Sequence, residues 1–339
     1  MKRIWILITL SVVVIAAGMW ALWPRNRQAL VLYSAVDYGP EVAQAFTRAT
    51  GIKVKAIRLS TGALLARVSA EGTRPAWDMV WFDGDEAAAA LDSAGLLARQ
   101  TTPDLDWNAQ GKALLPQDGS YTPTGLTLAG AFTYRVGTLT NPPTSWQDLN
   151  SPSLHGKIGM NNPAISGPMY PLLAGLLSQG GGWPAGQSLV LALKHNGLQV
   201  YPKNANTLAA MRAGDIKVAV TQSSAAWYMA SAHPELKVTL PKPSFALPSV
   251  LAVAQGVSPK VRAEAEKFIR FAMAPDTQRL RMSKGEADGF YWPLTQGAPA
   301  PVSVLPALSS IDVKHLNPAH WGPIESQVNH WFSEAIVGQ

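Results

Sequence analysis

The stretch from Leu59 to Asp92 most constrains what this chain can fold into, because it alternates polar turns with regular elements. Its Ser60-Thr61-Gly62 turn opens a short amphipathic helix. A buried strand from Trp77 to Phe82 then runs into Asp83-Gly84-Asp85, ahead of an alanine-rich helix. Open α/β sheets bind ligands where such turns follow neighbouring strands, and a turn ahead of a helix offers free N–H groups that favour an anion. The stretch therefore predicts one half of a ligand cleft.

A strand–helix–strand order precedes this stretch. Ala29 to Tyr33 is a short apolar strand, Glu41 to Thr50 carries its apolar residues on one helical face, and Ile52 to Ile57 alternates as a strand does. The order argues for a parallel sheet with right-handed crossover connections. With 339 residues, of which 47% are hydrophobic, the chain is long enough for two lobes that each bury a core.

Three later strands also end in polar turns. They are Gly156 to Met160, Leu198 to Tyr201, and the alternating segment from Ile216 to Val220. Their turns supply the polar candidates of the second half: Asn161, Ser166, Gly167, Asn206, Gln222, Ser223 and Ser224. Asn206 is also expected to cap a helix from Thr207 to Ala213. These turns predict the opposite wall of the cleft.

Two extended segments are expected to cross between the lobes, one strand from Thr124 to Arg135 and a return from Lys237 to Ala254. The predicted fold is therefore α/β with two lobes, each a mostly parallel sheet flanked by helices, preceded by an N-terminal hydrophobic helix. We assign residues 1–28 to a leader, residues 29–126 and 247–339 to the first lobe, and residues 127–246 to the second lobe.

The leader combines Lys2 and Arg3 with an apolar run of 20 residues from Ile4 to Trp23. This pattern predicts an export segment, and its length also suits an anchor in the inner membrane. A cleaved signal peptide and an uncleaved anchor both stay open, and either places the rest of the chain in the periplasm. Without residues 1–28 the charge falls from +6 to near +2, with 24 basic and 22 acidic residues and no dense basic patch. Nucleic acid is not an expected partner.

Enzymatic chemistry finds little support in the sequence. The chain has no cysteine, which excludes disulfides, thiolate metal sites and thiol nucleophiles. His315 and His320 lack the spacing of a helical zinc pair, and no nucleophile-elbow or phosphate-loop motif is present. We therefore predict a binding protein rather than an enzyme, with no cofactor.

Several segments together resemble the periplasmic solute-binding proteins of ABC importers, in the branch of ferric-iron and 2-aminoethylphosphonate-type binders. The matching pieces are LYSAVDYGPEVAQAFTRATGIKV, STGALLARVSAEGTRPAWDMVWFDGDEAAAALDSAGLL, NNPAISGPMYPLLAGLL and NTLAAMRAGDIKVAVTQSS, which with a helix near residues 259–274 cover most of residues 29–290. The resemblance implies a type II-like fold of two lobes, with cargo clamped between them by a hinge motion.

The resemblance also bears on the ligand. In ferric binders of this type a His, a Glu and two adjacent Tyr hold the metal, whereas the corresponding positions here are Asp37, Asp83 and Ser223-Ser224. Both phenolates are thus missing, although Tyr228 offers one nearby. The companion anion of such binders lies at a helix N-terminus after a Ser-Gly turn, which Ser166-Gly167 keeps. This combination favours a small anionic solute of the phosphonate or phosphate-ester type, with Asp37 and Asp83 pairing with an ammonium group.

The sequence thus predicts the substrate-binding component of an ABC importer, a monomer that delivers its solute to a permease and ATPase complex. The expected substrate-binding residues are Ser34, Asp37, Ser60, Thr61, Gly62, Asp83, Asn161, Ser166, Gly167, Asn206, Gln222, Ser223 and Ser224. Asp37 and the Ser60 turn also have a simpler interpretation as helix caps. One alternative is a ferric binder that holds Fe³⁺ and a companion anion with Asp37, Asp83 and Tyr228. Alternatives of another class are a membrane-anchored sensor and a tethered hydrolase.

Overall fold

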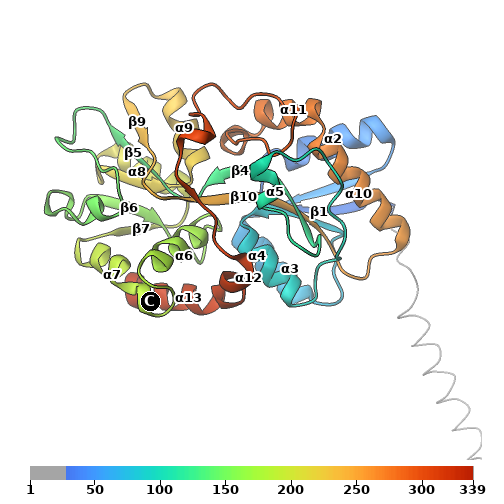
Figure 1. Cartoon of the computed structure of the whole chain (residues 1–339), viewed down its shortest axis with the longest axis horizontal. Helices are drawn as coiled ribbons and strands as arrows, with labels where there is room; N and C mark the ends of the chain where they lie inside the picture. The colour runs from blue at the N-terminus through green and yellow to red at the C-terminus, as the bar shows by residue number, and fades with distance from the viewer. Residues whose placement is uncertain (1–27, 339) are drawn as a thin grey trace, which may run out of the picture.

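The computed structural model describes residues 28–338, which form two lobes, each built on one β-sheet (Figure 1). The strands of the first sheet are β1 (Leu30–Ser34), β2 (Val54–Arg58), β3 (Met79–Asp83), β4 (Tyr121–Leu128), β10 (Ser244–Val253) and β11 (Val313–Lys314). Those of the second are β5 (Ala131–Arg135), β6 (Ile158–Asn161), β7 (Gln199–Tyr201), β8 (Val218–Thr221) and β9 (Leu236–Thr239).

Both sheets are mixed, which corrects the expectation of mostly parallel sheets. The first has the order β11-β10-β3-β1-β2 with β4 on β10, and the second has the order β7-β6-β8-β5-β9. Strand β1 runs parallel to β2 and β3, whereas β10 runs antiparallel to β3 and β4. Likewise β6 is parallel to β7 and β8, while β5 is antiparallel to β8 and β9. Of the strands next to the crossings, β10 and β5 therefore run against the parallel strands of their sheets, whereas β4 and β9 run in the same direction as those strands.

Helices cover both sheets (Figure 1). Around the first sheet lie α2 (Gly39–Thr50), α3 (Thr61–Glu71), α4 (Asp85–Ser93), α5 (Ala109–Ala113), α10 (Pro259–Met273) and α11 (Pro275–Lys284). Around the second lie α6 (Met169–Gln179), α7 (Ser188–His195), α8 (Asn204–Ala213) and α9 (Ser223–Ala232). The chain ends in α12 (Pro318–Trp321) and α13 (Glu325–Phe332).

Strand β3 shows why the first sheet is buried on both faces. Its side chains alternate, so that Met79 and Trp81 join a core with α2 and α10, whereas Val80 and Phe82 join a separate core with α3 and α4. All five residues of β3 are buried as a result. A strand covered on both faces reads as a continuous apolar run, which is how the sequence presents it.

The expected single strand from Thr124 to Arg135 is wrong, because β4 and β5 belong to different sheets. The chain changes lobes at Ala129-Gly130, where a Cβ on Gly130 would lie 2.5 Å from the Trp146 ring. Only a glycine fits this close passage. The expected return from Lys237 to Ala254 is likewise divided, into β9 of the second sheet and β10 of the first.

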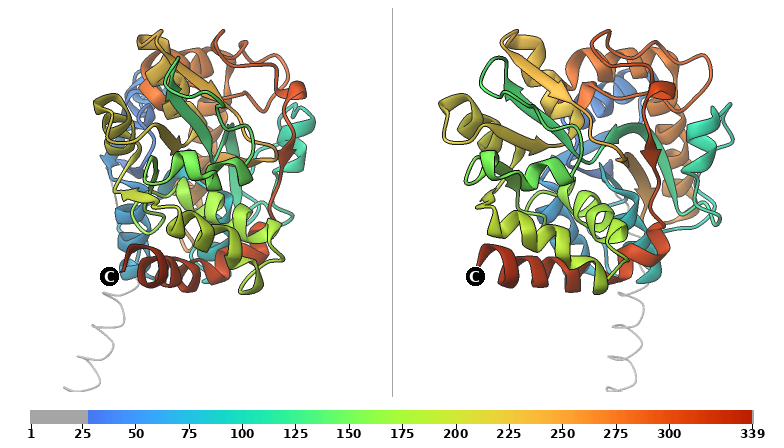
Figure 2. Two further views of the ribbon diagram at one scale, coloured as in Figure 1. Left: turned by 90° about the vertical axis from the view of Figure 1, so that its left-hand side faces the viewer. Right: turned by 60° about the vertical axis from the view of Figure 1, so that its left-hand side comes forward.

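The C-terminal segment contacts both lobes (Figure 2). Helix α12 packs against α4 of the first lobe. Trp321, Val328 and Phe332 share one hydrophobic core with the leucines of α6 in the second lobe. These residues were expected in the first lobe, as part of residues 247–339.

The apolar segment of residues 4–23, expected to be an export signal or anchor, lies outside the described residues. Between residues 28 and 338, no helix combines the length and apolar character needed to cross a membrane.

Candidate functional site

A cavity of about 620 Å³ lies between the lobes, with walls from both. Eight of the residues named from the sequence line it: Asp37, Ser60, Thr61, Asp83, Ser166, Gly167, Gln222 and Tyr228. We call this cavity the cleft. The polar turns at the strand ends of the two sheets therefore meet in space, as the strand–turn pattern predicts.

The two Gly-containing turns touch each other across the lobes. Ser60 caps α3 by accepting a hydrogen bond from the Ala63 N–H at 3.4 Å. Opposite it, a Cβ on Gly167 would lie 2.3 Å from Thr61 Cγ2, so no larger residue fits there while the turns touch. Gly62 faces the Ile165 carbonyl less tightly, with a Cβ distance of 3.2 Å. Thr61 against Gly167 is thus a direct contact between the lobes.

Asp83 ends β3 and is 7% exposed. Its carboxylate accepts hydrogen bonds from the Ser249 hydroxyl and, at 3.0 Å, from Gln222 Nε2 of the other lobe. Gln222 also donates to Thr127 at 3.1 Å, which fixes its amide. Burial raises the pKa of the Asp83 carboxyl, while the bonds from Ser249 and Gln222 lower it. Asp83 therefore joins the lobes as an acceptor whose oxygens are both occupied.

Arg281 lies behind Asp83 and is fully buried. Its guanidinium lies 4.6 Å and 4.5 Å from the ring centroids of Tyr38 and Tyr291, and Nη2 donates to the Tyr38 hydroxyl at 3.0 Å. The positive charge also lowers the pKa of the Asp83 carboxyl. Aromatic faces and a nearby carboxylate together allow a buried cation here.

Asp37 pairs with Arg58, and its N–H donates to Asp288 Oδ2 at 2.7 Å. It does not cap α2, which begins after Tyr38 without a side-chain cap. Burial and the charge of Asp83 raise the pKa of the Asp288 carboxyl well above its usual range, while Arg58 lowers it. This side of the cleft is therefore a network of three acids and one arginine.

Four helix N-termini border the cleft: those of α3, α6, α8 and α9. Only α3 has a side-chain cap, so the first N–H groups of α6, α8 and α9 are left to other partners. Arg58 and Lys203 add two cations to the lining. Helix N-termini carry partial positive charge, and together with two cations they suit an anion.

Of the other predicted residues, Ser34, Ser223 and Ser224 are buried behind the cleft wall. Ser34 donates to the Val36 carbonyl at 2.9 Å, and Ser223 accepts from the Leu128 N–H at 2.9 Å. The Ser224 hydroxyl is buried without a partner among residues 28–338. Asn206 lies inside α8, which begins at Asn204, so its expected capping role is wrong. Its place in the lining is taken by Asn204 and Ala205.

Asn161 holds two residues of the cleft wall in place by hydrogen bonds. Its amide donates to Asn204 Oδ1 at 2.5 Å and to the Ser166 hydroxyl at 3.3 Å, and its carbonyl oxygen accepts from Thr207. It is fully buried and does not line the cavity. Asn161 thus holds Ser166 and Asn204, which do line it, at a fixed separation.

Four residues that line the cleft had no role predicted from the sequence: Arg58, Lys203, Glu286 and Asp288. Arg58 is the last residue of β2, directly before the Ser60 turn, and Lys203 opens the turn that leads into α8. A cation at the end of a strand was therefore the missed signal. Glu286 and Asp288 come from a short 3₁₀ turn, Glu286–Gly289, for which no local pattern predicted a place in the cleft.

The described residues do not hold a ready metal centre. Residues 28–338 contain no group of three His, Cys, Asp or Glu side chains that could hold a metal ion. Asp37 and Asp83 are already engaged with Arg58, Ser249 and Gln222. Tyr228 is 41% exposed and packs edge-on against the Phe290 ring. The three suggested iron ligands are thus not arranged as a set.

Two lobes with a polar cleft between them define the class of hinged solute-binding proteins. The sequence model of the bacterial extracellular solute-binding protein family matches residues 41–308, and the chain belongs to this family. Its members are periplasmic solute-binding components of ABC importers rather than enzymes.

Other known proteins are similar to this chain in sequence or in structure. An uncharacterized protein of Haemophilus influenzae is 29% identical over 178 residues, 49% of this chain and 51% of that protein, so the match spans about half of that relative. The iron-bound protein HitA of Pseudomonas aeruginosa matches with a TM-score of 0.76 and 21% identity, over 91% of this chain and 99% of that one. The fructose-6-phosphate-bound protein AfuA of Actinobacillus pleuropneumoniae matches with a TM-score of 0.79 and 16% identity, over 91% and 98%. At these identities the two structures show the fold alone.

Proposed function

We propose that this protein captures a small anionic solute of the phosphonate or phosphate-ester type in the cleft and delivers it to an ABC permease and ATPase. The observation that carries the proposal is the convergence of four helix N-termini with Arg58 and Lys203 on one cavity. The anionic group lies against Lys203 and the N-termini of α6 and α8. Charge-assisted hydrogen bonds of this kind are the strong ones.

The acids of the cleft suggest a second group on the solute. Asp83, Glu286 and Asp288 line the cavity beside the Asp37–Arg58 pair. An ammonium group on the same solute would compensate the acids, while its phosphonate or phosphate contacts Lys203. A zwitterionic aminoalkylphosphonate matches both ends, which a simple phosphate ester does not.

Calorimetric titration of the purified protein tests this proposal. The panel is 2-aminoethylphosphonate, glycerol phosphate and inorganic phosphate, with ethanolamine as the compound that lacks the anionic group. We expect saturable one-site binding of at least one phosphorus compound and none of ethanolamine. Binding of ethanolamine alone, or of no compound in the panel, contradicts the proposal. A complementary mass spectrum of the protein under native conditions identifies any solute that stays bound through purification.

Ferric iron is the second candidate, because the iron-bound HitA shares the fold and Asp37 and Asp83 occupy positions suggested for metal ligands. Adding Fe³⁺ with citrate and recording the visible spectrum separates the two proposals. A phenolate from Tyr228 on iron gives a coloured complex, and a Tyr228→Phe variant then loses the colour. A colourless protein that leaves the metal with citrate rules out iron binding of this kind.

We further propose that residues 4–23 export the protein and keep it at the inner membrane as an uncleaved anchor. Fractionation of cells with detection of the C-terminus tests this, because a cleaved signal releases the protein with the soluble periplasmic contents. N-terminal sequencing of the mature protein then locates the cleavage. If the protein is instead a sensor without a role in transport, deleting its gene should leave the uptake of the solute by the cells unchanged.

A further inference from the structure

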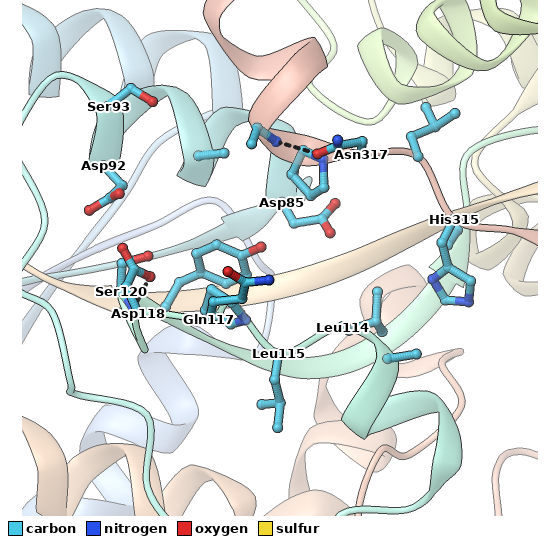
Figure 3. A pocket seen from close by; sticks show the side chains of 18 residues that line it. Asp85, Asp92, Ser93, Leu114, Leu115, Gln117, Asp118, Ser120, His315 and Asn317 are labelled. Atoms are coloured by element: carbon cyan, nitrogen blue, oxygen red, sulfur yellow. Dashed lines mark hydrogen bonds between the residues drawn. The ribbon is translucent and has the colours of Figure 1, made fainter.

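A second cavity of about 540 Å³ lies beside α4 and shares no residue with the cleft. Its walls are one face of α4, the segment of residues 113–121 that leads into β4, and the segment of residues 315–319 that leads into α12 (Figure 3). We call it the α4 cavity. Its volume lies within the range of small-molecule sites.

Asp85 supplies the charge of the α4 cavity. Its side chain is 7% exposed and points into the cavity (Figure 3). None of the ion pairs among residues 28–338 involves it, whereas the neighbouring Asp92 and Asp118 both pair with Arg99, at 3.2 Å and 3.1 Å. The next residue, Glu86, is a buried acid that shares a side-chain hydrogen bond with Asp85, and its Oε2 has no hydrogen-bond partner within the described chain. Burying two neighbouring acids without a cation beside them is costly, so a cation bound at Asp85 would be favoured.

Part of the remaining lining can contact the body of an organic cation, beside polar side chains such as Gln117 and Asn317. Ala89, Leu114, Leu316 and Pro318 present apolar surface, and the Tyr121 hydroxyl joins the lining near Asp85. Tyr121 is 4% exposed, and no side-chain hydrogen bond of its hydroxyl occurs within residues 28–338. Small-molecule sites typically combine such apolar walls with a few oriented polar groups.

We propose that the α4 cavity is a second ligand site, which binds a small organic cation with its ammonium group on Asp85 and its apolar body against Leu114 and Leu316. This site stands apart from the solute cleft in position and in charge. A bare metal ion fits it poorly, because residues 28–338 contain no group of three His, Cys, Asp or Glu side chains that could hold one.

Tryptamine, an ammonium group on an aromatic body, is a suitable probe, and indole-3-propionate carries the opposite charge on the same ring. Titration calorimetry of the full-length protein at pH 8 is expected to show saturable one-site binding of tryptamine and none of indole-3-propionate. Asp85→Asn is expected to weaken tryptamine binding at least about tenfold, the effect of losing roughly one charged hydrogen bond. Asp215→Asn removes the same charge from an exposed position and leaves binding unchanged.

A second variant separates loss of the ligand site from loss of the fold. Ala89→Phe fills the α4 cavity from helix α4 without changing any charge, and it is expected to abolish tryptamine binding while circular dichroism stays as in the unmodified protein. Asp288→Asn, a substitution in the cleft, is expected to leave tryptamine binding in the α4 cavity unchanged. The proposal is overturned if tryptamine does not bind, if Asp85→Asn and Ala89→Phe bind it normally, or if Asp288→Asn alone loses it.

Discussion

Asp83 and Asp85 stand two residues apart in one turn, yet they face different cavities and have different surroundings. Asp83 faces the cleft, accepts hydrogen bonds from Ser249 and Gln222, and has the buried Arg281 charge nearby. Asp85 faces the α4 cavity with no cationic partner among residues 28–338. Two neighbouring acids thus differ in their surroundings: Asp83 has hydrogen-bond donors from both lobes and a nearby arginine, whereas the acid beside Asp85 is Glu86.

The charges around the two cavities follow the same division. The cleft gathers Arg58, Lys203 and the N-termini of several helices, whereas His315 is the sole Lys, Arg or His side chain among the described residues that line the α4 cavity. Burial lowers the pKa of His315, so this ring is neutral at pH 7. The cleft holds acids as well, but of the two cavities it alone offers Lys and Arg side chains to an anionic group, and each prediction below changes one cavity while leaving the other as its control.

The largest effect is expected at the contact between the lobes. Gly167→Ala places a Cβ 2.3 Å from Thr61 Cγ2 and therefore holds the turns apart. Overpacking of this kind costs about 1–3 kcal/mol, so we expect cleft affinity to fall by up to about 100-fold. Small-angle scattering with saturating solute should show a larger radius of gyration than that of the unmodified protein.

The double variant Thr61→Gly/Gly167→Ala is the control for this contact. The atoms nearest to the added Cβ all belong to the Thr61 side chain, so removing that side chain restores the space. Affinity should return toward that of Thr61→Gly alone, and tryptamine binding in the α4 cavity should not change in either variant. Equal affinity of Gly167→Ala and the unmodified protein would show that this contact is not needed for solute capture.

The second effect concerns the stability of the α4 cavity. Burial raises the pKa of the Asp85 carboxyl from 3.8 to about 6, with Glu86 beside it. The folded protein therefore binds more protons than the unfolded chain between these values, and stability falls as pH rises through that window. Asp85→Asn removes this loss, so we expect it to be more stable at pH 8 by about 1–3 kcal/mol.

Chemical denaturation of Asp85→Asn and the unmodified protein at pH 4 and pH 8 measures this difference. The gain should be small near pH 4, because the loss of stability only begins as pH rises past the unfolded pKa of 3.8. A small opposing loss follows from removing a negative charge from the first turn of α4. If the variant is no more stable at pH 8, then Asp85 is already compensated, and the contrast with Asp83 fails.

The sequence predicted β1, β3 and α2 of the first lobe well, because these elements follow from local apolar patterns. It did not predict the division between β4 and β5, because both halves read as extended chain and only the passage of Gly130 past Trp146 separates them. The positions of α12 and α13 across both lobes depend on tertiary packing of Trp321 and Phe332. The local spacing of apolar residues does not show which lobe such a helix packs against.

The candidate site shows the same limit. Turns at strand ends brought Asp83, Thr61, Ser166 and Gln222 to the cleft, as expected for strands of an open α/β sheet. Which residue of each turn faces the cavity was not predictable: Asn161 points into a buried hydrogen-bond network, and the lining is formed by residues it holds. The α4 cavity had no sequence signal, because its walls come from segments far apart in the chain.

The third effect tests whether the cleft binds the negatively charged group of its solute. Lys203→Gln removes an exposed cation next to the uncapped N-terminus of α8. We expect solute affinity to fall by about tenfold, the loss of roughly one charge-assisted contact, and to depend less on salt. Lys237→Gln removes the same charge from an exposed position of the second lobe that does not line the cleft. If Lys203→Gln and Lys237→Gln bind the solute with equal affinity, the solute does not contact Lys203.

The smallest effect is expected at Gly62, on the same turn as Thr61. A Cβ there would lie 3.2 Å from the Ile165 carbonyl oxygen, a distance that a shift of a few tenths of an ångström relieves. Gly62→Ala also favours helix α3, because alanine is the better helix former by about 1 kcal/mol. We therefore expect a slightly raised melting temperature and a change in solute affinity below about threefold. If instead Gly62→Ala weakens binding as much as Gly167→Ala, the whole turn rather than the single Thr61–Gly167 contact sets the distance between the lobes.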